Sequence, residues 1–269
     1  TPPPVSALSY SALSRFAQCG YRFYLERVLR LPEQEAPPIP GMVAPALLDP
    51  RVRGSIAHEL LEELAAPDDE RVREQAARHD VELTDGDVVD IRELVENGLA
   101  SKLMQRVTAA AERHVEESFA LALKAPEHAH VPLFTGFIDL RAIEADGTAL
   151  IVDYKTDRLD GADPEAVVEH GYGVQRRLYA LAALRAGAPR VEVAHLFLER
   201  PAQPAVARYD AAEADELEAQ LALEAADVLS GRFAVAELPH RDLCATCPGR
   251  GGLCSWPEEV TLRSLADID

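Results

Sequence analysis

The sequence lacks the features of a membrane or secreted protein. No apolar run among its 269 residues approaches the roughly 20 residues of a membrane-spanning helix, and no signal-like segment opens it. It also lacks an initiating Met: it begins Thr-Pro-Pro-Pro, from which we expect a piece of a longer protein with the prolines in a linker. With 48% hydrophobic and 27% charged residues, the chain is expected to be globular.

Positive charge is scarce. There are only three lysines, at positions 102, 124 and 155, and the formal net charge is −19, which argues against nonspecific binding of nucleic acid. Arginines nevertheless gather in residues 1–30 and 171–190, and the guanidinium group suits bidentate contact with phosphate. These arginines are Arg15, Arg22, Arg27, Arg30, Arg176, Arg177, Arg185 and Arg190.

Cysteine is also rare, and its spacing is informative. Cys19 stands alone, whereas Cys244, Cys247 and Cys254 form a C-x2-C-x6-C pattern within eleven residues. Without a secretory signal, this spacing indicates ligands of a metal or of a metal cluster.

The stretch 136–155 contains the most chemically suggestive residues. Apolar segments flank an Asp-Gly turn at 146–147, a pattern that predicts a β-hairpin. In a strand Asp153 and Lys155 project to one face, and Asp139 lies on the partner strand. A carboxylate among apolar residues needs a compensating cation, so these residues alone fit either a divalent metal site or a structural Asp–Lys ion pair.

The remaining elements predict an α/β sandwich. Two short helices are expected in 5–31, with Ser9 or Ser11 as the first cap and Cys19-Gly20 ending the first helix. A helix is expected to begin at Gly54 and to present His58 beside its apolar stripe. The other expected elements are one or two helices in 68–113, strands at 114–123 and 191–198, and helices at 164–185 and 211–229.

Five short motifs occur in order along the chain, and together they resemble a known family. They are Gly54-x-x-x-His58, a glutamate near position 116, Gly136-x-Ile-Asp139, Asp153-Tyr-Lys155 and Gln175-x-x-x-Tyr179. From about residue 8 to 257 the chain resembles the RecB-type branch of the PD-(D/E)xK nucleases. The cysteine pattern is similar to the iron–sulfur staple of the AddB nuclease domain. The N-terminal segment around Cys19 resembles the start of the nuclease module that ends bacterial UvrD-like helicase–nucleases of the AddAB/AdnAB type.

This resemblance implies a fold and an organisation. The fold would be a restriction-endonuclease-like core, a central mixed sheet flanked by helices, with an iron–sulfur staple joining the two ends of the chain. Residues 1–269 would form one nuclease domain. Its parts would be N-terminal helices with the first cysteine at 5–31, a proline-rich loop at 32–53, a helical region at 54–113, a nuclease core at 114–230 and a cysteine-rich segment at 240–257.

The resemblance also implies roles for individual residues. His58, Asp139, Asp153 and the backbone carbonyl of Tyr154 would bind Mg²⁺ or Mn²⁺, with Glu116 preferred over Glu117 as a further ligand. Lys155 would position or deprotonate the attacking water, or stabilise developing charge. Gln175 and Tyr179 would complete the catalytic set together with Asp139, Asp153 and Lys155, and Arg176 and Arg177 would contact DNA.

Cys19, Cys244, Cys247 and Cys254 would bind a [4Fe–4S] cluster, in line with the same resemblance. Zinc and disulfide bonds are the alternatives. The cluster would have a structural role, although electron transfer or redox sensing is also consistent with it.

The expected activity is Mg²⁺- or Mn²⁺-dependent hydrolysis of phosphodiester bonds, acting as an exonuclease on single-stranded DNA in DNA end processing and recombinational repair. The partners would be DNA and a helicase motor in the bacterial cytoplasm. The alternatives are a catalytically silent DNA-binding or scaffold module, a redox module built on the cluster, and a nuclease acting on RNA.

Overall fold

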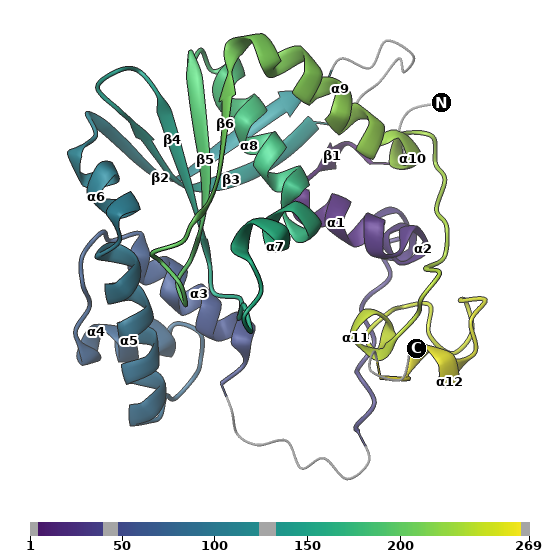
Figure 1. Cartoon of the computed structure of the whole chain (residues 1–269). Coiled ribbons are helices and arrows are strands. Elements are labelled where there is room, and N and C mark those ends of the chain that lie inside the picture. Colours follow the sequence, from purple (N-terminus) through teal and green to yellow (C-terminus); the bar gives the residue numbers. More distant parts are fainter. Residues whose placement is uncertain (1–4, 40–47, 124–132, 265–269) are drawn as a thin grey trace. The chain divides into compact units, whose positions relative to one another are not determined.

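The computed structural model describes residues 5–39, 48–123 and 133–264 (Figure 1). The remaining residues, which include the N-terminal prolines and part of the predicted proline-rich loop, lie outside the described ranges. The chain divides into two compact units. Unit 1 consists of Thr1–Val43, Ala120–Thr135 and Glu218–Asp269, and unit 2 consists of Ala44–Phe119 and Gly136–Leu217.

A mixed β-sheet forms the centre of unit 2. Strands β3 and β4 form the predicted antiparallel hairpin, β5 runs parallel to β4, β6 runs antiparallel to β5, and β2 also pairs with β3. This arrangement confirms the predicted α/β class with a central mixed sheet. The strands are β2 (Glu112–Ala122), β3 (Leu133–Ile143), β4 (Ala149–Lys155), β5 (Arg190–Phe197) and β6 (Ala205–Asp210).

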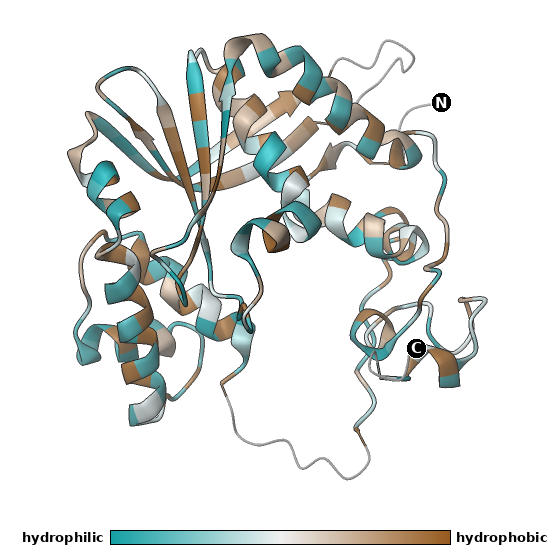
Figure 2. Ribbon diagram, in the orientation of Figure 1, coloured by the Kyte–Doolittle hydropathy of each residue, from teal (hydrophilic) through white to brown (hydrophobic). Residues whose placement is uncertain are grey.

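β4 is buried on both faces because helices cover both faces of the sheet. Leu150, Val152 and Tyr154 belong to the hydrophobic cluster formed with α3 (Pro50–Leu61) and the three helices that follow it. Ala149 and Ile151 point the other way, into the cluster formed with α8 (Gly173–Arg185). Figure 2 shows hydrophobic residues along these strands. Their alternation fixes the face on which each polar residue of β4 lies.

Three helices, rather than the one or two predicted, occupy residues 68–113. Each begins at its own capping residue, because a side-chain oxygen there accepts a hydrogen bond from the first turn. Thr84 forms a capping box with Asp87, and Ser101 caps the third helix. The helices are α4 (Asp69–Ala77), α5 (Asp85–Leu99) and α6 (Lys102–Ala109).

Other boundaries also differ from the prediction. α3 begins four residues before Gly54, at Pro50, because Asp49 caps it. The helix expected over 164–185 is divided at Tyr172, which has non-helical φ and ψ, into α7 (Pro164–Gly171) and α8. The helix expected over 211–229 consists of the short η2 (Ala211–Glu213), α9 (Ala214–Glu224) and α10 (Ala226–Leu229). Strand β6 was not predicted.

Unit 1 brings the N-terminal helices and the cysteine-rich segment together. Ser9 caps α1 (Tyr10–Gln18), and Cys19 separates it from α2 (Gly20–Phe23), as predicted. A π-helical turn, η1 (Tyr24–Val28), continues α2, and Phe23 stacks on Phe233 with ring centroids 6.2 Å apart. The remaining elements are β1 (Ala7–Leu8), which pairs with Leu133 and Phe134, α11 (Arg241–Cys244) and α12 (Glu258–Thr261).

No helix in the described ranges has both the length and the apolar character needed to span a membrane.

Candidate active site

The β3–β4 hairpin brings a carboxylate and an ammonium group together in unit 2. Its turn closes with Gly147 at φ +82°, a left-handed conformation that glycine adopts without steric cost. Asp153 and Lys155 lie two residues apart on β4 and share a face, as predicted. Lys155 Nζ lies 2.6 Å from Asp153 Oδ2, and Asp153 is only 1% exposed.

Asp139 and His58 join this pair from two other elements. Asp139 Oδ2, on β3, accepts a hydrogen bond of 2.9 Å from the backbone N–H of Tyr154. The same oxygen lies 3.5 Å from Nδ1 of His58 on α3. The His58 ring packs edge-on against Tyr154, with centroids 5.8 Å apart. Three groups that are distant in sequence therefore meet at one end of the hairpin.

Gly54 explains how α3 can lie so close to Thr156, the residue that follows β4. A Cβ at this position would lie 2.8 Å from Oγ1 of Thr156, the residue after Lys155, which is closer than real Cβ atoms come to a neighbour. Only glycine avoids this overlap. One helical turn further along, His58 reaches Asp139 because of it.

A chain of hydrogen bonds links Lys155 to α8. Lys155 Nζ donates to Gln175 Oε1 at 3.0 Å, and Gln175 Nε2 donates to the Tyr179 hydroxyl at 3.0 Å. The Tyr179 O–H faces two acceptors, the backbone carbonyl of Phe137 at 2.8 Å and Asp153 Oδ1 at 3.2 Å. The i, i+4 pair on α8 thus contacts both charged residues of β4.

The two carboxyl groups have pKa values displaced in opposite directions. Burial, and then the nearby charge of Asp153, raise the pKa of Asp139 well above its usual value. Burial would also raise the pKa of Asp153, but Lys155 and His195 outweigh it and leave that pKa below its usual value. Burial lowers the pKa of His58, so its imidazole is neutral at pH 7 and keeps a lone pair for a metal.

Adjacent Glu116 and Glu117 point to different surroundings. Glu117 forms a two-point ion pair with Arg141. Glu116 has φ +49°, which breaks the regular alternation of β2, and it lines a cavity of about 380 Å³ together with His58 and Thr156. Burial and then Asp153 raise the pKa of Glu116. The structure thus directs Glu116 toward the site, and its role as a metal ligand stays a prediction.

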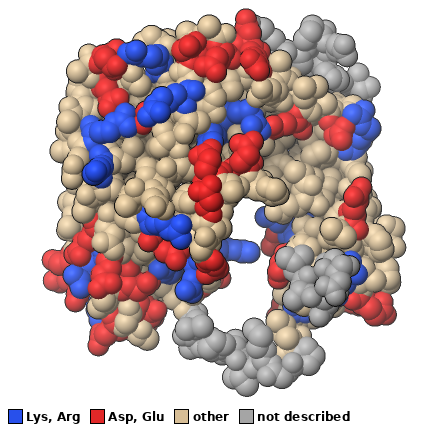
Figure 3. All heavy atoms as spheres, viewed as in Figure 1, with Lys and Arg blue, Asp and Glu red and all other residues tan. Residues whose placement is uncertain are grey.

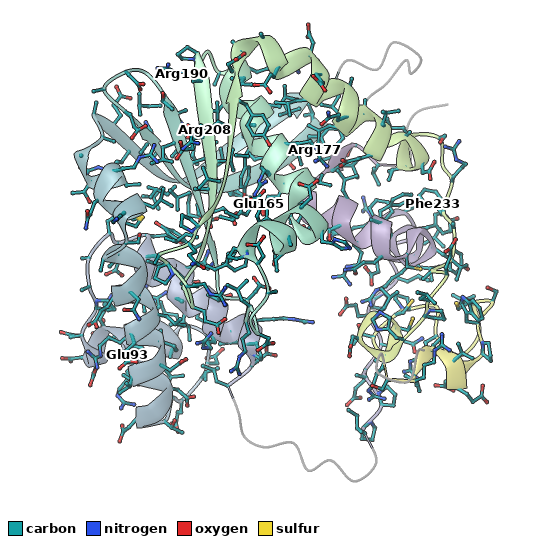
Figure 4. All side chains as sticks on the ribbon, in the orientation of Figure 1. Glu93, Glu165, Arg177, Arg190, Arg208 and Phe233 are labelled. Atoms are coloured by element: carbon teal, nitrogen blue, oxygen red, sulfur yellow. The ribbon has the colours of Figure 1, made fainter. Side chains whose placement is uncertain are left out.

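Arg176 does not have the surroundings expected of a DNA contact. Its side chain is 5% exposed, and Nη1 lies 2.6 Å from Oε1 of Glu165 on α7. This buried, paired guanidinium joins α7 to α8, and its contact with DNA stays a prediction. Arg177 follows on α8 and is partly exposed (Figure 4). Its contact with DNA stays a prediction.

Two residues of the site were not predicted. Tyr172 lies where the predicted helix breaks, and Lys155 Nζ lies 4.1 Å from the centroid of its ring. His195 is fully buried on β5 and is paired in register with Asp153. A single histidine in an apolar strand carries no recognisable signal, and only the strand order could have revealed its position.

The donor chemistry of the site fits a hard divalent cation. Asp153 Oδ2 is buried, and its close polar contact among the described residues is the ammonium group of Lys155 at 2.6 Å. Carboxylate oxygens with one neutral imidazole suit Mg²⁺ or Mn²⁺. In the described ranges, no group of three or more His, Cys, Asp or Glu side chains has the arrangement of a complete metal site.

The four cysteines lie together in unit 1. Cys19, Cys244, Cys247 and Cys254 are free thiols that line one small cavity of about 20 Å³. Burial raises the pKa of Cys244 to about 11, and the other three thiols contribute less to the same shift. The structure thus brings the predicted ligand set into one cavity, although within the described residues the set does not form a complete metal site.

Comparisons with known proteins give a family and a fold. The sequence matches the PD-(D/E)XK nuclease superfamily over residues 7–252. The structure is similar to a presumed exonuclease from Eubacterium rectale, with 13% identity, a TM-score of 0.53 and coverage of 94% of this chain and 90% of that one. It also resembles the protein SSO0001, with 14% identity, a TM-score of 0.40 and coverage of 91% and 84% respectively. No curated protein matches the sequence.

Proposed function

Because the chain belongs to the PD-(D/E)XK nuclease superfamily, we propose that it is a metal-dependent deoxyribonuclease that cleaves single-stranded DNA as an exonuclease. The observation that carries this proposal is the meeting of His58, Asp139, Asp153 and Lys155 at one end of the β3–β4 hairpin. Two carboxylates and a neutral imidazole can bind a divalent metal, and a lysine beside them can stabilise negative charge on a phosphate.

Asp139, Asp153 and His58 would hold Mg²⁺ or Mn²⁺, with the Tyr154 carbonyl and Glu116 as further ligands. When bound, such an ion activates water and neutralises negative charge on the phosphate. Asp139 is already fixed by the Tyr154 N–H, and Asp153 by the Tyr179 hydroxyl. These contacts orient both carboxylates before substrate arrives.

Lys155 would act on the water and on the phosphate. Asp153 and Gln175 accept from its ammonium group, and the Tyr172 ring lies beside it. Its position is therefore fixed from three sides. A fixed cation stabilises the negative charge that develops on the phosphate oxygens in the transition state.

For the cysteines we propose a structural [4Fe–4S] cluster bound by Cys19, Cys244, Cys247 and Cys254. Their shared cavity supports this proposal. Thiolates are the ligands of such clusters, so the raised pKa of Cys244 means that cluster assembly would release a proton there. A helicase motor and a role in DNA end repair belong to the same proposal and rest on the resemblance of the sequence motifs.

The test compares cleavage of end-labelled single-stranded DNA, duplex DNA and RNA by the purified chain with Mg²⁺, with Mn²⁺ and with a chelator. We expect metal-dependent shortening of single-stranded DNA from its end. Tight DNA binding without cleavage under any metal would favour the silent binding module instead. Cleavage that persists after chelation would contradict metal catalysis.

A further inference from the structure

One face of β5 carries a polar side chain among apolar ones. Val191, Val193 and Phe197 are alternate residues of the strand and are all buried. His195 lies between Val193 and Phe197 on the same face of the strand and is fully buried. Another apolar side chain would pack at this position without a buried polar group, so the imidazole requires an explanation beyond packing.

His195 lies beside the proposed catalytic carboxylate. β4 and β5 are parallel, and the register pairs His195 with Asp153. Residues paired in this way direct their side chains to the same face of the sheet. Tyr172 contacts this region too: its ring centroid is 5.9 Å from that of His195, and Lys155 Nζ is 4.1 Å from it. The imidazole is therefore part of the group that surrounds Asp153 and Lys155.

The imidazole has unused hydrogen-bonding capacity. Neither ring nitrogen of His195 has a hydrogen-bond partner among the described residues. An imidazole with one protonated nitrogen offers one N–H donor and one acceptor. Its N–H can therefore orient a neighbouring carboxylate.

We propose that His195 is a positioning residue of the active site: its N–H, which has no partner in the described residues, donates to the neighbouring Asp153 carboxylate when that carboxylate binds a metal. This inference rests on the proposed function, because it assigns His195 to the metal-binding carboxylate of that site. Groups that orient a metal ligand typically change metal affinity by about 10- to 100-fold. The readout can therefore be metal binding itself, without DNA.

The experiment measures Mn²⁺ affinity of the metal-free chain by electron paramagnetic resonance of unbound Mn²⁺, together with the melting temperature. His195→Leu keeps the side-chain volume and removes the N–H, and we expect about 10- to 100-fold weaker Mn²⁺ binding. His195→Asn and His195→Gln replace one or the other ring nitrogen by an amide. We expect one of the two to bind Mn²⁺ within about threefold of wild type, since it retains the orienting donor.

Val193→Ala is the matched packing control, since it alters the same face of β5 two residues away. It should lower the melting temperature and leave Mn²⁺ affinity unchanged. Wild-type affinity in His195→Leu would overturn the proposal, as would equal losses in all three His195 variants. If His195→Leu does not fold, the two amide variants decide: unequal affinities support the proposal, and equal affinities contradict it.

Mn²⁺ binding tests the role of His195, whereas cleavage of nucleic acid tests the proposed function. A wild-type chain that binds Mn²⁺ with this pattern but cleaves no nucleic acid would refute the nuclease assignment and support the role of His195. A wild-type chain that binds no Mn²⁺ would overturn both.

Discussion

At the scale of single residues, Asp139 is where stability and function oppose each other. Burial raises its pKa well above the usual value of 3.8, so the folded, metal-free protein binds a proton there more tightly than the unfolded chain does. The folded state is therefore favoured while Asp139 is protonated. This advantage is lost as the pH rises from about 4 through the pKa of Asp139 in the folded protein. In the proposed function, this destabilising carboxylate is needed as a metal ligand.

We predict that Asp139→Asn melts at a higher temperature than wild type at about pH 8 in the presence of a chelator, and that the difference narrows as the pH falls and wild-type Asp139 takes up its proton. The amide oxygen can still accept from the Tyr154 N–H. A gain of 1 kcal/mol would raise the melting temperature by about 2–4 °C. Nuclease activity should fall in the same variant.

Asp85→Asn is the control for this measurement, because the Asp85 side chain is 97% exposed. It should change neither the activity nor the pH dependence of melting. An Asp139→Asn variant that melts below wild type at about pH 8 would contradict the destabilising role of the buried carboxylate.

Sequence patterns predicted the position of some site residues but not of others. Alternation along β4 was enough to place Asp153 beside Lys155, because the period of a strand is two whatever surrounds it. His195 could not be found in this way, since its place beside Asp153 depends on which strand pairs with β4. The sequence likewise does not reveal that Glu165, eleven residues earlier, pairs with Arg176.

At the scale of elements, the close approach of α3 to the end of β4 positions His58. We predict that Gly54→Ala lowers nuclease activity by about 10- to 100-fold, because the helix moves away from Thr156 and a displacement of about 1 Å in a catalytic group can cost this much. The measurement is the cleavage rate at saturating metal, with circular dichroism to confirm folding.

Gly86→Ala is the matched control for this prediction. Gly86 also lies in the first turns of a helix, and the nearest atom to an added Cβ is Thr84 Oγ1 at 3.7 Å, an ordinary contact. This variant should keep full activity and be equally or slightly more stable. Wild-type activity in Gly54→Ala would show that catalysis does not depend on the close approach of α3 to Thr156.

Local sequence patterns predicted the type and position of the secondary-structure elements. They predicted less well how many separate elements a segment contains. The Asp-Gly turn and the apolar runs beside it identified the hairpin. The sequence from 68 to 113 shows one helical periodicity throughout, and only the caps at Thr84 and Ser101 divide it. β6 alternates weakly and lies at the end of the strand order, so it gave no clear pattern.

At the scale of the whole molecule, the charge is strongly negative but locally balanced. On the face seen in Figure 3, acidic and basic side chains lie side by side over α4 and α5. Ion pairs such as Arg92–Asp69 and Arg53–Asp90 account for part of this pattern. On this face, acidic side chains therefore offset much of the positive charge that would attract phosphate.

The cysteine cavity carries a prediction for unit 1. We expect anaerobically purified protein to show brown visible absorbance and bound iron, and Cys247→Ser to lose both. The variant should also melt at a much lower temperature, because a cluster that binds only the folded state contributes its binding energy to stability. Iron analysis and a UV–visible spectrum measure this, and a colourless, stable wild type that contains zinc would contradict it.

The most direct test of the whole account is the rate at which single-stranded DNA is cleaved, with saturating Mg²⁺ or Mn²⁺, by wild type, Asp153→Ala and Asp85→Ala. A metal-bound site supplies several kcal/mol of transition-state stabilisation, so we predict that Asp153→Ala is at least about 100-fold slower and that Asp85→Ala matches wild type. Equal rates in wild type and a folded Asp153→Ala variant would contradict the assignment of this hairpin as the active site.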